Sequence, residues 1–218
     1  MKILHILDHS IPLHSGYTFR TKAILEQQRI NGWETVHVTS IKHTAESPEE
    51  EIVDGLHFYR THAAGGIFNR IPLLNQIAVV STLAGRLDQV IESEKPDILH
   101  AHSPSLNGLA ALRAGKKHNI PVVYECRAFW EDAAVDHGTS KEGGLRYRLT
   151  RALETRVFQR ADAVTTICEG LKRDISNRGI TTDKITVIPN AVDIDRFKMN
   201  GERNPELAAE LDLNGKLV

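Results

Sequence analysis

Short runs rich in β-branched residues alternate along the chain with segments of helical periodicity, and this alternation restricts the fold more than any other feature. The strand-like runs are KILHIL (2–7), ETVHVTS (34–40), DILHAHS (97–103), PVVYECR (121–127), DAVTTIC (162–168) and KITVIPN (184–190). Several are largely apolar, which is typical of strands covered on both faces. Repeated strand–helix–strand units predict an α/β fold, a Rossmann-like parallel sheet with helices on both faces.

Helical periods separate these runs. The clearest is a spacing of three or four residues between Ile77, Val80, Ala84, Leu87 and Ile91. Further helices are predicted over residues 17–31, 105–117, 144–159 and 169–178. The pair Asp54-Gly55 stands between two short apolar runs and predicts a hairpin within residues 51–59.

Composition excludes several classes of protein. The 218 residues are 41% hydrophobic and 25% charged, which is ordinary for a globular chain, and a net charge of -1 gives no global attraction to nucleic acid. Cys126 and Cys168 form neither a disulfide framework nor a CxxC metal pair, which suits a reducing compartment. The apolar start is too short for a signal peptide or a membrane span. We expect a cytoplasmic protein, and peripheral contact with the inner membrane stays open.

The end of the chain reads as the entrance to another domain. A polar stretch follows PNAVDIDRF (189–197), then a short helical pattern at 204–213 and the apolar start GKLV of a strand. Because a strand needs partners, we expect one domain over 1–197, with 198–218 as linker and start of a second domain. A frayed natural terminus is the alternative.

Polar side chains gather where the predicted strands end, and ligands of open α/β sheets bind outside those carboxyl ends. The candidate site residues are Ser15, Gly16, Tyr17, Arg20, His102, Glu125, Arg127, Trp130, Glu131, Asp132, Glu169 and Asn190. An exposed Trp130 could pack on a sugar ring while nearby charged groups bind its hydroxyls. Packing of Trp130 in the core is the alternative interpretation.

Four motifs resemble the N-terminal half of a family 4 glycosyltransferase of the two-Rossmann GT-B type. They are MKILHILDHSIPLHSGY (1–17), PDILHAHSP (96–104), ETRVFQRADAVTTICEGLKRDI (154–175) and KITVIPNAVDIDRF (184–197). The resemblance covers nearly the whole chain, and the last two motifs are the most specific. VVYECRAFWEDAAVDHGT (122–139) is similar to a bacterial subgroup that assembles exopolysaccharides or related surface glycans.

The resemblance implies a retaining hexosyltransferase that moves a sugar from a UDP- or GDP-linked nucleotide-sugar to a glycan or lipid-linked acceptor, without a metal or another cofactor. In such enzymes the nucleotide lies mainly in the C-terminal domain. This chain would form the acceptor-side half and be inactive alone. The catalytic positions would be Arg127, Glu125 and His102, and the other candidate residues would bind the donor diphosphate or the acceptor.

The chain departs from the family pattern at several positions. Ser15 replaces one of two glycines common in the first loop, Ala191 replaces a turn glycine, and Cys168 replaces a serine. The family often has a histidine after the strand where this chain has Glu125-Cys126-Arg127. The role of that histidine in holding the donor sugar therefore cannot be transferred by identity.

Elementary chemistry adds roles for the first loop. Gly16 lacks a Cβ, so backbone N–H groups beside it can approach an anion at the positive end of the following helix. Arg20, one turn later, could bind phosphate. A simple helix-entry turn is the alternative, and the absence of GxGxxG gives dinucleotide binding no support.

Candidate residues two positions apart on one strand lie on the same face of the sheet. His100 and His102 share one face, but a metal needs a third ligand, which only a distant histidine or Glu125 could supply, so we expect no metal. Glu125 and Arg127 also share a face, either as a structural ion pair or to orient an acceptor hydroxyl and a phosphate. In front-side transfer the leaving phosphate takes the acceptor proton, so positive groups matter more than a base.

The helix predicted over residues 144–159, together with its end, is rich in arginine. Its basic residues are Arg146, Arg148, Arg151, Arg156 and Arg160, which suits anionic lipid. Glu142 and Glu154 dilute this charge and helical spacing spreads the arginines around the axis, which is typical of a solvated surface. Two other functions compete with glycosyl transfer. One is a stand-alone ligand-binding module, and the other is a sugar-nucleotide epimerase, which shares the two-domain architecture.

Overall fold

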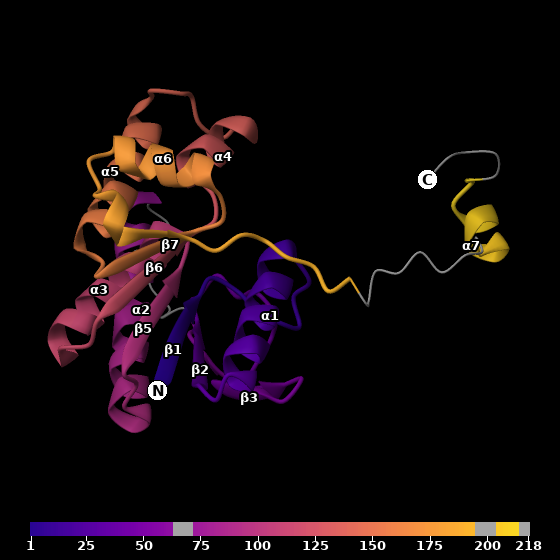
Figure 1. The fold of residues 1–218 in the computed structure, drawn as a ribbon, viewed down its shortest axis with the longest axis horizontal. Helices are drawn as coiled ribbons and strands as arrows, with labels where there is room; N and C mark the ends of the chain where they lie inside the picture. The colour runs from indigo at the N-terminus through magenta and orange to yellow at the C-terminus, as the bar shows by residue number, and fades with distance from the viewer. Residues whose placement is uncertain (63–71, 195–203, 214–218) are drawn as a thin grey trace.

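Figure 1 shows the computed structural model, which describes residues 1–62, 72–194 and 204–213. The strands are β1 (Lys2–Leu7), β2 (Glu34–Thr39), β3 (Glu50–Val53), β4 (Leu56–Arg60), β5 (Ile98–His102), β6 (Val122–Cys126), β7 (Ala163–Thr166) and β8 (Ile185–Val187). The helices are α1 (Gly16–Ile30), α2 (Pro72–Glu94), α3 (Ser105–His118), α4 (Trp130–Asp136), α5 (Leu145–Arg160), α6 (Glu169–Asn177) and α7 (Pro205–Glu210), and a short 3-10 turn, η2, covers Thr182–Lys184.

The strands form one sheet in the order β3-β4-β2-β1-β5-β6-β7-β8. Neighbours are parallel except β3 and β4, which pair antiparallel as the predicted hairpin, with Asp54 and Gly55 at positive φ in its turn. The Rossmann-like parallel sheet expected from the sequence is therefore confirmed. Because the strands of each βαβ unit run the same way, their carboxyl ends meet at one edge of the sheet.

The two faces of this sheet differ sharply in chemistry. On one face, Leu4, Leu99 and Tyr124 are completely buried in a core that also contains Leu87 of α2 and Ala110 of α3. Figure 1 shows α2 and α3 on this side of the strands and α1 on the other side. Helices therefore cover both faces, as predicted, but α1 meets a different surface.

The face under α1 is lined with histidines. His5 pairs in register with His37 of β2 on one side and with His100 of β5 on the other, and His102 pairs with Glu125 of β6. Residues opposite one another in parallel strands point to the same face, so these five side chains form one polar seam across the sheet. Polar and apolar positions alternate along β2, which separates the apolar core from this seam, whereas in β1 His5 shares its face with Ile3 and Leu7.

Three features differ from the sequence-based expectations or lie outside the description. Helix α4 was not predicted, because its seven residues are too few to show a period. The predicted helix at 204–213 is present as the shorter α7. The proposed strand start GKLV and most of the predicted linker lie outside the described residues.

A buried pair of carboxyl groups lies between α4 and α5. Glu131 pairs with Arg178 at 2.6 Å, and Glu154 accepts a hydrogen bond of 2.8 Å from the hydroxyl of Tyr124. Glu154 is completely buried, and burial together with the nearby charge of Glu131 raises its pKa to about 8. Glu154 is therefore mainly protonated at neutral pH.

We predict that Glu154→Gln removes a pH dependence of folding. Between pH about 4.5 and about 8 the folded chain holds a proton on Glu154 that the unfolded chain has lost, so stability falls as pH rises, by at most ~1.4 kcal/mol per pH unit. Urea unfolding at several pH values should show this slope in the wild type and a flatter one in the variant. Glu142→Gln, at an exposed position, should keep the wild-type slope; equal slopes in all three proteins would contradict the assignment.

Candidate functional site

A single carboxylate lies at the centre of the strand-end cluster. Glu125, near the end of β6, accepts hydrogen bonds from Arg20 Nη2 at 2.8 Å and Arg20 Nε at 3.1 Å. Its other oxygen lies 3.0 Å from Arg127 Nη2 and 2.7 Å from His102 Nδ1. Its side chain is only 3% exposed. The structure thus brings together four of the predicted site residues, from α1, β5, β6 and the segment after β6.

This environment keeps Glu125 ionised. Burial by itself works to raise the pKa of the carboxyl, but the contact with His102 and the charge of Arg127 outweigh it and hold the pKa well below its usual range. Two guanidinium groups against one carboxylate leave the cluster with one net positive charge. The net charge of the cluster therefore favours an anion nearby.

A chain of imidazoles extends from this carboxylate beneath α1. His102 Nε2 lies 2.9 Å from His5 Nδ1, and His5 Nε2 lies 2.8 Å from the Gln28 amide. Burial lowers the pKa of His102 to about 3, so its ring is neutral and carries one N–H. An arginine can only donate, so His102 accepts at Nδ1 from Arg127 Nη2, 2.6 Å away, and donates to His5 from Nε2. His5 in turn donates from Nε2 to the amide oxygen Oε1 of Gln28.

The two arginines are held by several protein partners. Arg20 also donates to the carbonyl oxygens of Ile188 at 3.1 Å and Pro189 at 3.3 Å, and to Asn190 Oδ1 at 2.8 Å. Its guanidinium joins α1 to the segment after β8. Binding phosphate directly would require Arg20 to release part of this set.

Arg127 is similarly occupied. It donates to the Tyr17 carbonyl oxygen at 3.0 Å and to Thr21 Oγ1 at 3.1 Å, and its guanidinium lies 4.3 Å from the centre of the Tyr17 ring. The side chain is 10% exposed. Arg127, Glu125 and His102 therefore form one enclosed network that positions α1, and the direct catalytic roles expected for them stay predictions.

The turn into α1 is the open part of the site. Ser15 caps the helix by accepting a hydrogen bond of 3.1 Å from Thr18 N. Gly16 has no positive φ, and a Cβ built on it would meet nothing within 4 Å. The chain itself therefore does not require glycine here, and the space beside the helix N-terminus is free for a ligand. The Tyr17 side chain is fixed to the end of β1, because its hydroxyl accepts a hydrogen bond of 3.0 Å from Asp8 N.

The residues of the RAFWED segment separate in the structure. Trp130 begins α4 with 42% of its surface exposed, so the core-packing alternative is wrong. Asp132 accepts a hydrogen bond of 2.9 Å from the Tyr147 hydroxyl and is exposed. Glu131 is 1% exposed and bound to Arg178, so its carboxylate faces the interior and supports α4 instead of facing a ligand. Glu169 and Asn190 are exposed.

His5 was not predicted as a site residue, and it completes a group of three imidazoles. Among the described residues, one nitrogen from each of His5, His100 and His102 lies within 4.8 Å of the others, close enough to consider a metal. His100 Nε2 is buried without a hydrogen-bond partner in the described part of the chain. The rings of His5 and His102, however, already satisfy one another. The signal that could have found His5 is its expected place beside His100 in a parallel sheet.

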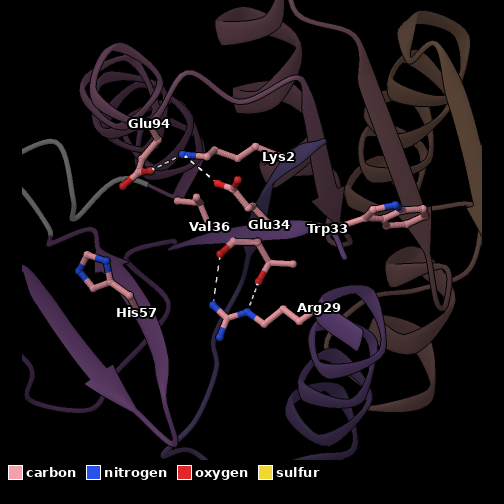
Figure 2. A pocket seen from close by; sticks show the side chains of 8 residues that line it. Lys2, Arg29, Trp33, Glu34, Val36, His57 and Glu94 are labelled. Atoms are coloured by element: carbon pink, nitrogen blue, oxygen red, sulfur yellow. Dashed lines mark hydrogen bonds and ion pairs between the residues drawn. The ribbon is translucent and has the colours of Figure 1, made fainter. Parts of the chain in front are cut away.

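A pocket of about 370 Å³ lies at the opposite, amino-terminal edge of the sheet (Figure 2). Its charged groups neutralise one another, because Lys2 lies 3.1 Å from Glu94 and 3.4 Å from Glu34. Arg29 is directed to Thr35, donating to Oγ1 at 2.8 Å and to the carbonyl oxygen at 3.4 Å. None of the described residues that line it has a buried polar atom without a partner, so this pocket is a weaker candidate than the carboxyl edge.

The chain is similar in sequence and in fold to known proteins. A family model described as "Glycosyl transferase 4-like domain" matches residues 15–191. The comparison with curated proteins gives no match. Among solved structures, sucrose-phosphate synthase from Thermosynechococcus elongatus is similar at a TM-score of 0.67 and 15% identity, covering 98% of this chain and 52% of that one.

Epimerases share the same fold. UDP-GlcNAc 2-epimerase from Methanocaldococcus jannaschii, in complex with UDP-GlcNAc and UDP, is similar at a TM-score of 0.57 and 15% identity, covering 87% of this chain and 47% of that one. The enzyme from Neisseria meningitidis, bound to UDP-GlcNAc, is similar at a TM-score of 0.54 and 15% identity, covering 86% of this chain and 46% of that one. The chain thus spans about half the length of these structures, and such identities show a shared fold alone.

We predict that Glu125→Gln strongly destabilises the fold. The amide leaves the buried guanidinium groups of Arg20 and Arg127 without a counter-charge, which typically costs about 3–5 kcal/mol. Urea unfolding at pH 7 measures the loss. Glu26→Gln, whose partner Lys22 is 3.9 Å away on the surface, should change stability by less than about 0.5 kcal/mol. A loss below about 1 kcal/mol for Glu125→Gln would show that the carboxylate does not hold the cluster together.

Proposed function

Because the chain belongs to the glycosyl transferase 4-like domain family, we propose that it forms the acceptor-side half of a retaining glycosyltransferase. The donor would be a UDP- or GDP-linked sugar and the acceptor a glycan or lipid-linked saccharide. The observation that carries this proposal is the family match over residues 15–191, which contains the open Gly16 turn and the charged cluster beneath it.

The geometry suits a diphosphate at this turn. The N-terminus of α1 provides backbone N–H groups and the positive end of the helix dipole. The missing Cβ of Gly16 lets an oxygen approach that backbone, and the net positive charge around Glu125 lies just below. Arg20 and Arg127 would act through this charge while remaining bound to their protein partners.

A retaining transfer fits the protonation states of the cluster. In front-side attack the acceptor hydroxyl gives its proton to the leaving phosphate as the new glycosidic bond forms and the bond to phosphate breaks. The protein must then stabilise the phosphate and orient the hydroxyl. Neutral, buried His102 and fully bonded Glu125 are suited to positioning, while exposed Trp130 offers an apolar ring face to a sugar.

Nothing in this reaction requires a metal, and none of its steps uses the three-histidine group. The domain division at residue 197 and the binding of the nucleotide by a following domain remain parts of the proposal. The epimerases with bound UDP-GlcNAc support a nucleotide-sugar as the ligand of this fold. They also make epimerisation the second candidate, and a binding module without turnover is the third.

The three candidates are separated by one assay. The complete reading frame is expressed and incubated with individual UDP- and GDP-sugars, with and without saccharide and lipid-linked acceptors. We expect donor consumption that depends on an acceptor. Isomerisation of the donor without an acceptor would favour the epimerase, and binding of donors without any consumption would favour the module.

We predict that Gly16→Val lowers kcat/KM for transfer by at least about tenfold, the effect of losing a phosphate contact of roughly 1.4 kcal/mol. The branched side chain would occupy the free space beside the α1 N-terminus, while stability should change by less than about 1 kcal/mol because nothing surrounds it. Gly85→Val is the matched control, at an exposed glycine of α2 that is equally unobstructed. Normal turnover of Gly16→Val would remove this turn from the proposed site.

A further inference from the structure

Helix α4 is attached to the domain through a polar side chain. Of its seven residues, all of which the structure describes, Glu131 alone is buried. Trp130, the first residue, is 42% exposed, and the other carboxylates of the helix, Asp132 and Asp136, are exposed as well. A helix of about two turns is not stable by itself in water, so α4 depends on its contacts with the rest of the domain.

Glu131 meets a buried group of polar side chains from three other parts of the chain. Its Oε1 accepts a hydrogen bond of 2.6 Å from Nη2 of Arg178, the residue after α6. Glu154 of α5 accepts one of 2.8 Å at its own Oε1 from the hydroxyl of Tyr124 on β6. The two carboxyl groups also hydrogen-bond one another. Glu131 is 1% exposed, and Glu154 and Tyr124 are completely buried.

The remaining two oxygens show how the carboxyl groups are joined. Glu131 Oε2 and Glu154 Oε2 are both buried, and neither accepts from an N–H or hydroxyl group in the described part of the chain. An ionised carboxylate can only accept, so two ionised groups could not bond to one another. A single proton between the two Oε2 atoms turns one of them into a donor and satisfies both. The pair then holds one negative charge, which Arg178 balances.

The surroundings of the pair leave this proton without a substitute. Burial raises the pKa of Tyr124 and of the Cys126 thiol, both on β6, well above their usual range, so both stay neutral. Helix α3 also packs against α5, and none of its buried residues is titratable. Among the described residues, Arg178 is the one cation that forms an ion pair with either carboxyl group.

We propose that one proton, shared by Glu131 and Glu154, holds α4 on the domain and positions Trp130. Without this proton, two carboxylates face each other in the interior beside one guanidinium. That arrangement favours a state in which Glu131 leaves the cluster and is solvated. Helix α4 then detaches, because Glu131 is its one buried side chain. The detached segment begins after Phe129, which is itself buried, with its ring centre 6.5 Å from that of Phe158.

The shared proton gives the attachment a pH dependence of defined sign. Burial and the nearby charge of Glu131 raise the pKa of Glu154 to about 8, whereas a solvated glutamate releases its proton near pH 4.5. Between these values only the attached state holds the proton. The ratio of detached to attached α4 therefore rises with pH, by up to about tenfold per unit, and levels off above the higher pKa.

Trp130 moves with this helix. It is the first residue of α4, and it follows Arg127 at the carboxyl edge by three positions. Figure 1 shows α4 grouped with α5 and α6. Because Glu131 and Glu154 are enclosed in the interior, they are positioning residues that affect this edge through Trp130. The inference concerns the attachment of α4 and stands whatever reaction the site performs.

Hydrogen exchange of the α4 backbone amides, measured on the whole chain from about pH 5.5 to about pH 9, tests the proposal. Division by the exchange rates of an unstructured peptide removes the intrinsic effect of pH and gives an opening constant. We expect the α4 opening constant to rise by up to about tenfold per pH unit and to level off above about pH 8. It should exceed the opening constant of β6 at every pH, because the β6 amides report unfolding of the whole domain.

Two variants replace the shared proton with an amide N–H that donates at every pH. Glu154→Gln places this donor on α5 and Glu131→Gln places it on α4, so the α4 opening constant should become independent of pH in both. Asp132→Asn is the matched control, because Asp132 is the neighbouring carboxylate of the same helix and accepts its hydrogen bond of 2.9 Å from the exposed Tyr147 hydroxyl. It should keep the wild-type slope. Circular dichroism verifies that each variant is folded.

Three outcomes would overturn the proposal. The first is an α4 opening constant of the wild type that does not change with pH. The second is equal opening constants for α4 and β6, which would mean that α4 opens only when the domain unfolds. The third is a slope that persists in the folded glutamine variants, which would assign the titration to another group.

Discussion

The ion cluster around Glu125 is the constraint on which the arrangement of this domain depends. A buried carboxylate is costly unless its oxygens are fully satisfied, and here Arg20 and Arg127 satisfy them from two separate segments. The cluster fixes the position and rotation of α1 against the sheet. Because α1 carries the Gly16 turn, the geometry of this turn depends on the ion cluster beneath it.

The polar seam explains why α1 differs from the other helices. Where α2 and α3 pack by apolar contact alone, α1 meets histidines whose hydrogen bonds have defined directions, beside a smaller apolar cluster around Leu25. Burial lowers the pKa of His37, His100 and His102 to about 3, so these rings stay neutral and each offers one donor and one acceptor. Directional bonds tolerate less sliding than apolar packing does. The face nearest the proposed substrate is therefore the more precisely specified one.

The sequence predicted the local elements well because strands and helices of this chain have strong periods. The six main strands, the hairpin and the longer helices all occur close to their expected residues, and the polar rim is where the carboxyl ends meet. What the sequence did not contain is the pairing of distant strands. Only the register shows that His5 meets His102, that Arg20 binds Glu125, and that Glu131 turns inward.

Arg20 also determines where the chain departs from the sheet. By binding Ile188, Pro189 and Asn190 it continues the fixed path of the backbone three residues past the end of β8. The backbone is therefore held beside α1 as far as Asn190. Whatever is covalently attached beyond that residue has a shortened tether anchored at the ligand edge. A group on that tether therefore has a higher effective concentration at Gly16 than it would have on a tether that started at the end of β8.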